Sequence, residues 1–216
     1  IVYAIDTGLV TTVSFLAGVS ISLVTRDKVL LAGLIQIIAG TLAIFFGSYI
    51  STKAQKHFFE HQIEREKREI EEDPEKETQE IRDIFQDLGF NKEEQEIAVR
   101  RITRDKESWL RFMVQEEIGI SPGLIDNPYE IGLVSAFSFL LGAVPAILPF
   151  FLFENVNQDL FISAVSVLTF LFILGIAKTR ITKVYWLKSG IETVFIGAIS
   201  CGGGFFLGRI VAGFFH

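Results

Sequence analysis

Apolar residues along this chain fall into five long runs that are separated by polar segments. Crossing about 30 Å of hydrocarbon takes roughly 20 helical residues, and each run is about that long. A segment in lipid must satisfy its own backbone groups, so each run predicts a transmembrane helix. The runs cover residues 2–24, 29–51, 131–153, 160–177 and 191–214.

The long polar segment between the second and third runs has the periodicity of helices. Its apolar residues recur at helical spacings, at Ile63, Ile70, Ile81, Ile84, Phe85 and Leu88. Asp73 followed by Pro74 predicts that one helix stops and another begins. "NKEE" at 91–94 predicts a capping box, and a last helix is expected over about 105–118, ending at Gly119. We expect three or four helices, the first continuing from the second run without a break.

These elements predict an all-α integral membrane protein with five transmembrane helices and a cytoplasmic helical-bundle insert between helices two and three. We expect residues 1–51 to form transmembrane helices 1 and 2. Residues 52–128 are expected to form an acidic helical domain that binds metal. Residues 129–216 are expected to form transmembrane helices 3 to 5.

Composition agrees with this division. Hydrophobic residues make up 50% of the 216 residues, and 21 of them are Phe. The net charge is -6. Residues 53–117 contain 13 Lys/Arg and 19 Asp/Glu, so the whole excess of negative charge lies in the insert. An acidic insert disfavours nucleic acid as a partner, and the single Cys201 excludes an intrachain disulfide.

The charges of the short loops predict the orientation of the chain, because cytoplasmic loops are enriched in Lys and Arg. The stretch 178–188 carries four basic residues and no acidic one, so it is expected in the cytoplasm. The stretch 154–159 has no basic residue and is expected outside. The insert and the N-terminus are then cytoplasmic. The loop 25–28, with a small basic excess, is a mild exception on the outside.

Four glutamates of the insert form two pairs with i, i+3 spacing, at Glu66, Glu69, Glu77 and Glu80. The second pair follows eleven residues after the first, a spacing that returns to within roughly 20° on a helix. Pro74 interrupts the helix, so two helices that meet at a bend are expected to bring the carboxylates together. Converging carboxylates suit divalent cations. A solvated face of Glu–Lys pairs is the other interpretation, and it is supported by Lys67, Arg68 and Lys76.

Met113 is the one methionine of the chain, and it lies four residues before Glu117. A thioether beside a carboxylate adds a soft ligand to hard ones. This combination suits Fe2+, Mn2+ or Zn2+ better than Ca2+ or Mg2+. A methionine that only fills the core is the alternative.

The arrangement resembles the vacuolar iron transporter family, whose iron and manganese transporters include nodulin-21-like proteins. The resemblance covers nearly the whole chain. It rests on the five spans with their insert and on the stretches "GLVT" (8–11), "AGTLAIFFGSYIS" (39–51), "EREKREIEEDPEKETQEI" (64–81), "MVQEEIG" (113–119) and "GGGFFLGRIV" (202–211). It implies a homodimer that exports Fe2+, and often Mn2+, from the cytosol in exchange for protons, along a path between the subunits.

The resemblance also implies the metal ligands of the insert, which are Glu66, Glu69, Glu77, Glu80, Met113 and Glu117. One family glutamate, directly after the methionine, is Val114 here. The membrane spans depart further. Thr7 stands where the family has an Asp, and Asp6 lies one residue earlier, turned by about 100° on a helix. The family's span-two methionine and two acidic residues fall on Ile44, Gln36 and Ser48.

Two functions therefore remain open. The first is a transporter, not an enzyme, with no organic cofactor. Its partners are metal ions, protons, the lipid bilayer and a second copy of the chain. It would lie in a prokaryotic cell membrane or a vacuole-like organelle membrane. Its candidate path is lined by Asp6, Thr11, Gln36 and Ser48. The second is a membrane-anchored protein that binds or senses metal without conducting it, which the uncharged residues of span two favour.

Two further patterns have competing interpretations. "HFFEH" places His57, Glu60 and His61 on one stretch of helix. It fits an accessory metal site at the membrane, exposed histidines without a role, or a zinc protease, for which no supporting motif is present. Small-residue faces at Gly33, Gly40 and Gly47, and at Gly204 and Gly208, predict close helix packing or dimerisation. A path for a solute along the first face is the alternative.

Overall fold

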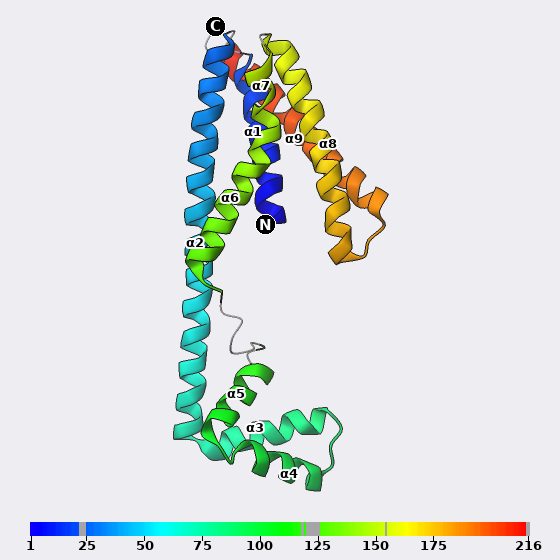
Figure 1. Cartoon of the computed structure of the whole chain (residues 1–216). Coiled ribbons are helices and arrows are strands. Elements are labelled where there is room, and N and C mark those ends of the chain that lie inside the picture. Colours follow the sequence, from blue (N-terminus) through cyan, green and yellow to red (C-terminus); the bar gives the residue numbers. More distant parts are fainter. Residues whose placement is uncertain (22–24, 118, 120–125, 154, 215–216) are drawn as a thin grey trace. The chain divides into compact units, whose positions relative to one another are not determined.

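The computed structural model describes residues 1–21, 25–117, 119, 126–153 and 155–214, and within them every regular element is an α-helix (Figure 1). The helices are α1 Val2–Val19, α2 Arg26–Glu72, α3 Pro74–Asp87, α4 Lys92–Ile102, α5 Lys106–Glu116, α6 Pro128–Ile147, α7 Pro149–Leu152, α8 Val156–Thr182 and α9 Trp186–Phe214. Five of them (α1, α2, α6, α8 and α9) are long and apolar enough to cross a membrane. The predicted all-α, multi-pass membrane protein is therefore confirmed.

The chain divides into two compact units. The membrane unit consists of Ile1–Tyr49 and Tyr129–His216, and the insert consists of Ile50–Pro128. Helix α2 is 47 residues long and contributes to both, so the first insert helix does continue from the second span. The apolar part of α2 ends near Ser51, and the rest of the helix is polar.

The core of the membrane unit lies where five helices meet. It contains buried side chains of α1, α2, α6, α7 and α8, among them Leu9, Leu16, Val29, Ile147, Phe150 and Leu171. Helix α9 packs against α1 and α8. Large apolar side chains also cover the outer faces, such as Ile35, Ile38, Leu42 and Phe46 on α2. A surface this apolar is expected to face lipid.

The small-residue faces of α2 and α9 pack against other helices of the same chain. A side chain at Gly33 would meet Leu16 and Ile147, and one at Gly40 would meet Phe139. Gly204 lies against the backbone of Ser14, while Gly47 is open. The prediction of close helix packing is therefore confirmed for these glycines, apart from the open Gly47.

The Gly8→Ala substitution is expected to destabilise the membrane unit. A Cβ at Gly8 would collide with the carbonyl oxygen of Phe139, so α1 and α6 would have to move apart. Overpacking of this kind costs about 1–3 kcal/mol. Thermal unfolding in detergent measures the change. Gly202→Ala is the matched control, because a Cβ there meets no atom within 4 Å. Equal stability of the two variants would contradict the packing described.

The ends of α8 differ from the predicted loops. The Asn155 side chain caps the helix by accepting a hydrogen bond from the backbone N–H of Asn157 (3.0 Å), so α8 begins at Val156 rather than near residue 160. At the other end it continues to Thr182, with Lys183 in the left-handed conformation (φ 54°). Most of the basic stretch 178–188 is therefore helical.

The insert forms the helices that its sequence signals predict. Asp73 caps α3 by accepting from the backbone N–H of Lys76 (3.2 Å), and Pro74 is the first residue of the helix. Asn91 and Glu94 form the predicted capping box of α4. Helix α5 begins after the Asp105 cap and ends at Glu116, slightly earlier than expected. Ile118 and the loop 120–125 lie outside the described residues.

Candidate metal centre

Two of the six predicted ligands are buried carboxylates inside the insert. Glu66 on α2 is 3% exposed, and Glu77 on α3 is 1% exposed. Oε1 of Glu66 and both carboxylate oxygens of Glu77 have no hydrogen-bond donor among the described residues. Burying a carboxylate without a donor is strongly unfavourable. These oxygens therefore need a proton or a cation.

The electrostatics of the two buried groups follow from their neighbours. Burial raises the pKa of Glu66 to about 8, helped by the charges of Glu117 and Glu77. Burial also raises the pKa of Glu77, with a further contribution from Glu80 that Lys76 opposes. The carboxyl group of Glu66 therefore lies within electrostatic range of those of Glu77 and Glu117. Near neutral pH, we expect a proton to reside on Glu66.

Glu69 and Glu80, the other members of the two pairs, form ion pairs at the rim. Oε1 of Glu69 lies 2.9 Å from Nε of Arg65, and Oε1 of Glu80 lies 3.0 Å from Nζ of Lys76. Each i, i+3 pair thus has one buried carboxylate with an oxygen that lacks a hydrogen-bond partner, and one partly exposed carboxylate with a basic partner. Nζ of Lys76 also lies 3.6 Å from Oε1 of the buried Glu77. Both interpretations of the sequence, converging carboxylates and a solvated ion-paired face, describe part of the structure.

The remaining two predicted ligands lie at the end of α5. Met113 is completely buried, in a cluster with Ile70, Ile81, Val99 and Trp109. Glu117, one turn later, is the exposed C-cap of the helix. The indole Nε1 of Trp109 is buried without an acceptor among the described residues, a feature that the sequence did not reveal. Met113 therefore contributes to the core of the insert, whatever its role towards metal.

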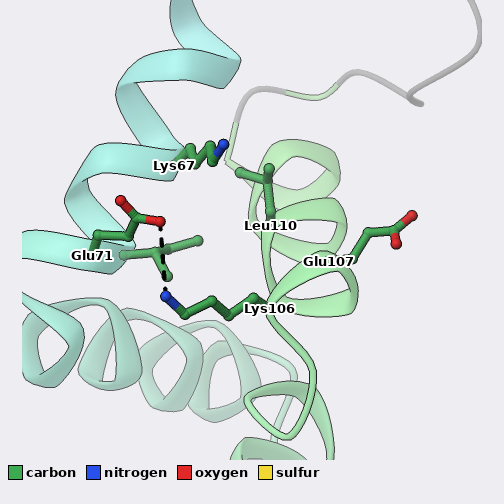
Figure 2. Close-up of a pocket in the computed structure, with 6 residues that line it drawn as sticks. Lys67, Glu71, Lys106, Glu107 and Leu110 are labelled. Carbon is green, nitrogen blue, oxygen red and sulfur yellow. Dashed lines mark ion pairs between the residues drawn. The ribbon is translucent and has the colours of Figure 1, made fainter.

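The hollow between α2 and α5 shown in Figure 2 is separate from the predicted metal ligands. It has a volume of about 290 Å³, and Lys67 and Lys106 are among its lining residues. Nζ of Lys106 lies 3.8 Å from Oε1 of Glu71. None of the six predicted ligands lines this hollow, and its two lysines disfavour a cation.

The carboxylates do not form a finished coordination shell. In the part of the chain that the structure describes, no three His, Cys, Asp or Glu side chains are arranged to hold a metal ion. Several oxygen ligands are needed around such an ion. Binding of a metal ion by the predicted ligands would therefore require their side chains to draw closer together.

The "HFFEH" stretch with His57, Glu60 and His61 precedes the predicted glutamate ligands on α2. His57 and His61 are exposed on α2. Oε1 of Glu60 lies 3.7 Å from Nζ of Lys56, in an exposed ion pair. Such a pair contributes little energy. The three residues remain candidates for an accessory metal site.

The four predicted path residues face different directions on their helices. Asp6 and Thr11 on α1 lie about 140° apart around the helix, and Gln36 and Ser48 on α2 lie about 120° apart. The Thr11 hydroxyl donates to the carbonyl oxygen of Thr7 (2.6 Å), whereas Oε1 of Gln36 is buried without a partner among the described residues. Their assignment to a transport path stays a prediction.

Asp6 is half-buried in the membrane unit and has a basic neighbour. Lys178 on α8 interacts with it electrostatically. The ammonium group of Lys178 also donates to Oγ1 of Thr193 on α9 (3.0 Å). The three residues connect α1, α8 and α9 by polar contacts. From the sequence, Lys178 was assigned to a basic loop, so its contacts with α1 and α9 were not predicted.

Comparison with known proteins gives consistent matches along the chain. A family model described as the VIT family matches residues 1–209. "Vacuolar iron transporter 1" of Arabidopsis thaliana is 29% identical over 211 residues, covering 98% of this chain and 84% of the plant protein. "Vacuolar iron transporter" of Plasmodium falciparum is 28% identical over 213 residues, covering 94% of this chain and 78% of that protein. "Vacuolar iron transporter" of Toxoplasma gondii is 30% identical over 182 residues, covering 80% and 60%.

Proposed function

This chain belongs to the VIT family, whose model matches it over residues 1–209, and from that membership we propose that it carries Fe2+ out of the cytosol across a membrane. The resemblance noted in the sequence is thereby confirmed. The relatives are named as iron transporters, which agrees with a transporter rather than an enzyme. The lipid-facing helices described above agree with a multi-pass membrane protein.

The observation that carries this proposal is the pair of buried carboxylates Glu66 and Glu77, whose buried oxygens lack hydrogen-bond partners among the described residues. A solvated acidic surface has no need to bury them. In the proposal, Glu66, Glu69, Glu77, Glu80, Met113 and Glu117 collect the metal. The oxygens attract the cation, and the thioether favours transition metals over Mg2+.

The proposal has finer parts, which follow from the resemblance and from the loop charges. Mn2+ is a second substrate, and Zn2+ is a further ion that the ligands would accept. The metal moves in exchange for protons. The protein is a homodimer. The insert is cytoplasmic, and the membrane is that of a prokaryotic cell or of a vacuole-like organelle, as the names of the relatives suggest.

Metal binding to the insert is expected to strengthen as the pH rises. A metal ion must displace the proton from Glu66, whose pKa is about 8, so each pH unit below that value costs affinity. We expect the dissociation constant for Mn2+ to fall about tenfold between pH 6 and pH 7 and to level off above pH 8. Isothermal titration in buffers of different ionisation enthalpy measures both the affinity and the proton released. Affinity independent of pH across this interval would contradict the role of Glu66.

A second candidate function is binding or sensing of metal without transport. It is favoured by uncharged residues at Gln36, Ile44 and Ser48, where the family has ligands. Proteoliposomes loaded with a metal-quenched dye separate the two functions. Entry of Fe2+ or Mn2+ supports transport. Tight binding to the insert with no entry of either ion would contradict it and leave the second function.

A further inference from the structure

A buried carboxylate that the proposed metal centre does not use lies near one end of the membrane unit. Asp159 is in the first turn of α8 and is completely buried. Neither of its carboxylate oxygens has a hydrogen-bond partner among the described residues. The sequence had assigned it to a loop between two spans. Because α8 begins at Val156, the residue is instead inside a membrane helix, where ionisable groups are costly and usually functional.

Arg26 is the charged group that acts on Asp159. It lies at the start of α2, and its guanidinium interacts with Asp159 electrostatically without forming an ion pair. Its Nε donates instead to the carbonyl oxygen of Phe150 on α7 (2.8 Å). The guanidinium is therefore anchored to a third helix, within electrostatic range of the carboxylate. A guanidinium has five N–H donors, so it has the capacity to bind a carboxylate as well.

No other charged group competes with Arg26 for Asp159 in the described part of the chain. Helix α7 has no ionisable residue, and α1 has only Tyr3 and Asp6. On α9 the charged residues are Lys188, Glu192 and Arg209, and none of them acts on Asp159. A buried carboxylate is stable when it is neutral or when it is paired. Asp159 thus has two acceptable states, one that carries a proton and one that is paired with Arg26.

A polar pocket lies beside the start of α8, close in sequence to Asp159. It has a volume of about 520 Å³, and Arg26, Asp27, Asn155 and Val156 are among its lining residues. Asn155 and Val156 precede Asp159 by four and three residues, so they lie on the same face of α8, one turn away. Arg26 therefore lines the pocket and also acts on the buried carboxylate. We call this hollow the α2–α8 pocket.

We propose that Asp159 is a proton-exchange site of the membrane unit, which Arg26 switches between its two states. Asp159 holds a proton while Arg26 is bonded to the Phe150 carbonyl. When Arg26 turns to Asp159, the carboxyl O–H bond breaks, a water molecule in the α2–α8 pocket takes the proton, and the carboxylate pairs with the guanidinium. The inference rests on the proposed function, because it supplies a proton site for exchange against metal.

Chemical labelling tests the proton site without any transport. Dicyclohexylcarbodiimide modifies protonated carboxyl groups in apolar surroundings, and mass spectrometry of the intact dimer or monomer in detergent locates the product. We expect Asp159 to be labelled, with less labelling as the pH rises. The Arg26→Gln variant removes the guanidinium that pairs with ionised Asp159. Labelling of Asp159 in this variant should therefore persist to higher pH. Absence of label on Asp159 at every pH, or labelling that does not change with pH, would overturn the inference.

Transport provides the second arm. In proteoliposomes, the Asp159→Asn variant is expected to lose proton counterflow by on the order of tenfold while its insert binds Mn2+ as the wild type does. Asp27→Asn is the control, because Asp27 is exposed and lines the same pocket. Unchanged proton counterflow in the Asp159→Asn variant would overturn the inference about Asp159 and leave the proposed function standing. Absence of metal entry in the wild type would overturn the proposed function, and the labelling would then decide the inference.

Discussion

Replacing both Glu66 and Glu77 with glutamine is expected to weaken binding of Mn2+ or Fe2+ to the protein by on the order of 100-fold. The substitutions keep the shape of the side chains and remove the two buried negative charges. Glutamine also brings an amide donor to a place where the cation needs oxygens. Each single variant is expected to lose less than the double variant. Titration with Mn2+ in detergent, or with Fe2+ under anaerobic conditions, measures the loss.

Two controls separate a ligand role from a general effect of charge or folding. Glu93→Gln changes an exposed glutamate of α4, so it should bind metal as the wild type does. Without metal, the double variant is expected to be at least as stable as the wild type, because it no longer buries carboxylates that lack donors. An affinity that equals the wild-type value in a folded double variant would contradict the assignment of these residues as ligands.

Two substitutions of Met113 are expected to separate its packing role from its ligand role. Met113→Ala removes a completely buried side chain from the cluster around Trp109 and should destabilise the insert by about 2–5 kcal/mol. Met113→Leu conserves volume and should cost less than about 1.5 kcal/mol. If the thioether binds metal, Met113→Leu nevertheless loses about tenfold in Fe2+ affinity, and its affinity for Mg2+ is unchanged.

The stability of these variants is measured by chemical unfolding followed through tryptophan fluorescence. Trp109 belongs to the same cluster as Met113, so its emission reports on this core directly. Trp186, at the start of α9, belongs to the membrane unit and provides an internal reference. Wild-type Fe2+ affinity in Met113→Leu would show that the methionine only packs. Equal stability of the alanine and leucine variants would contradict its burial.

Much of the helical architecture follows from local signals in the sequence. Five apolar runs of suitable length predicted the membrane helices. Asp73 with Pro74 and the Asn91 capping box fixed two helix starts, because a side-chain oxygen satisfies backbone N–H groups at these positions. Such signals act over a few residues and need no knowledge of the tertiary structure. The start of α8 was placed too late, because its cap is an asparagine in a short polar stretch that also reads as a loop.

Local sequence patterns could not predict which carboxylates are buried and which form ion pairs. Spacing placed Glu66 and Glu69 on one side of a helix, but their rotation relative to α3 and α5 decides which one is buried. The structure buries Glu66 and pairs Glu69 with Arg65. The interior position of Asp159 was missed for a related reason, because it depends on the packing of α8 against its neighbours.

The most direct test of the central claim is metal entry through the double variant. Wild type and Glu66→Gln/Glu77→Gln would be placed in liposomes that contain a metal-quenched dye and a pH dye, with metal supplied on the side of the insert at a limiting concentration. The account predicts that the wild type admits Fe2+ or Mn2+ with opposite proton movement. It also predicts that the double variant admits far less metal, with the difference narrowing at high metal concentration. Equal entry at limiting metal would show that the buried carboxylates do not collect metal for transport, and would contradict the account.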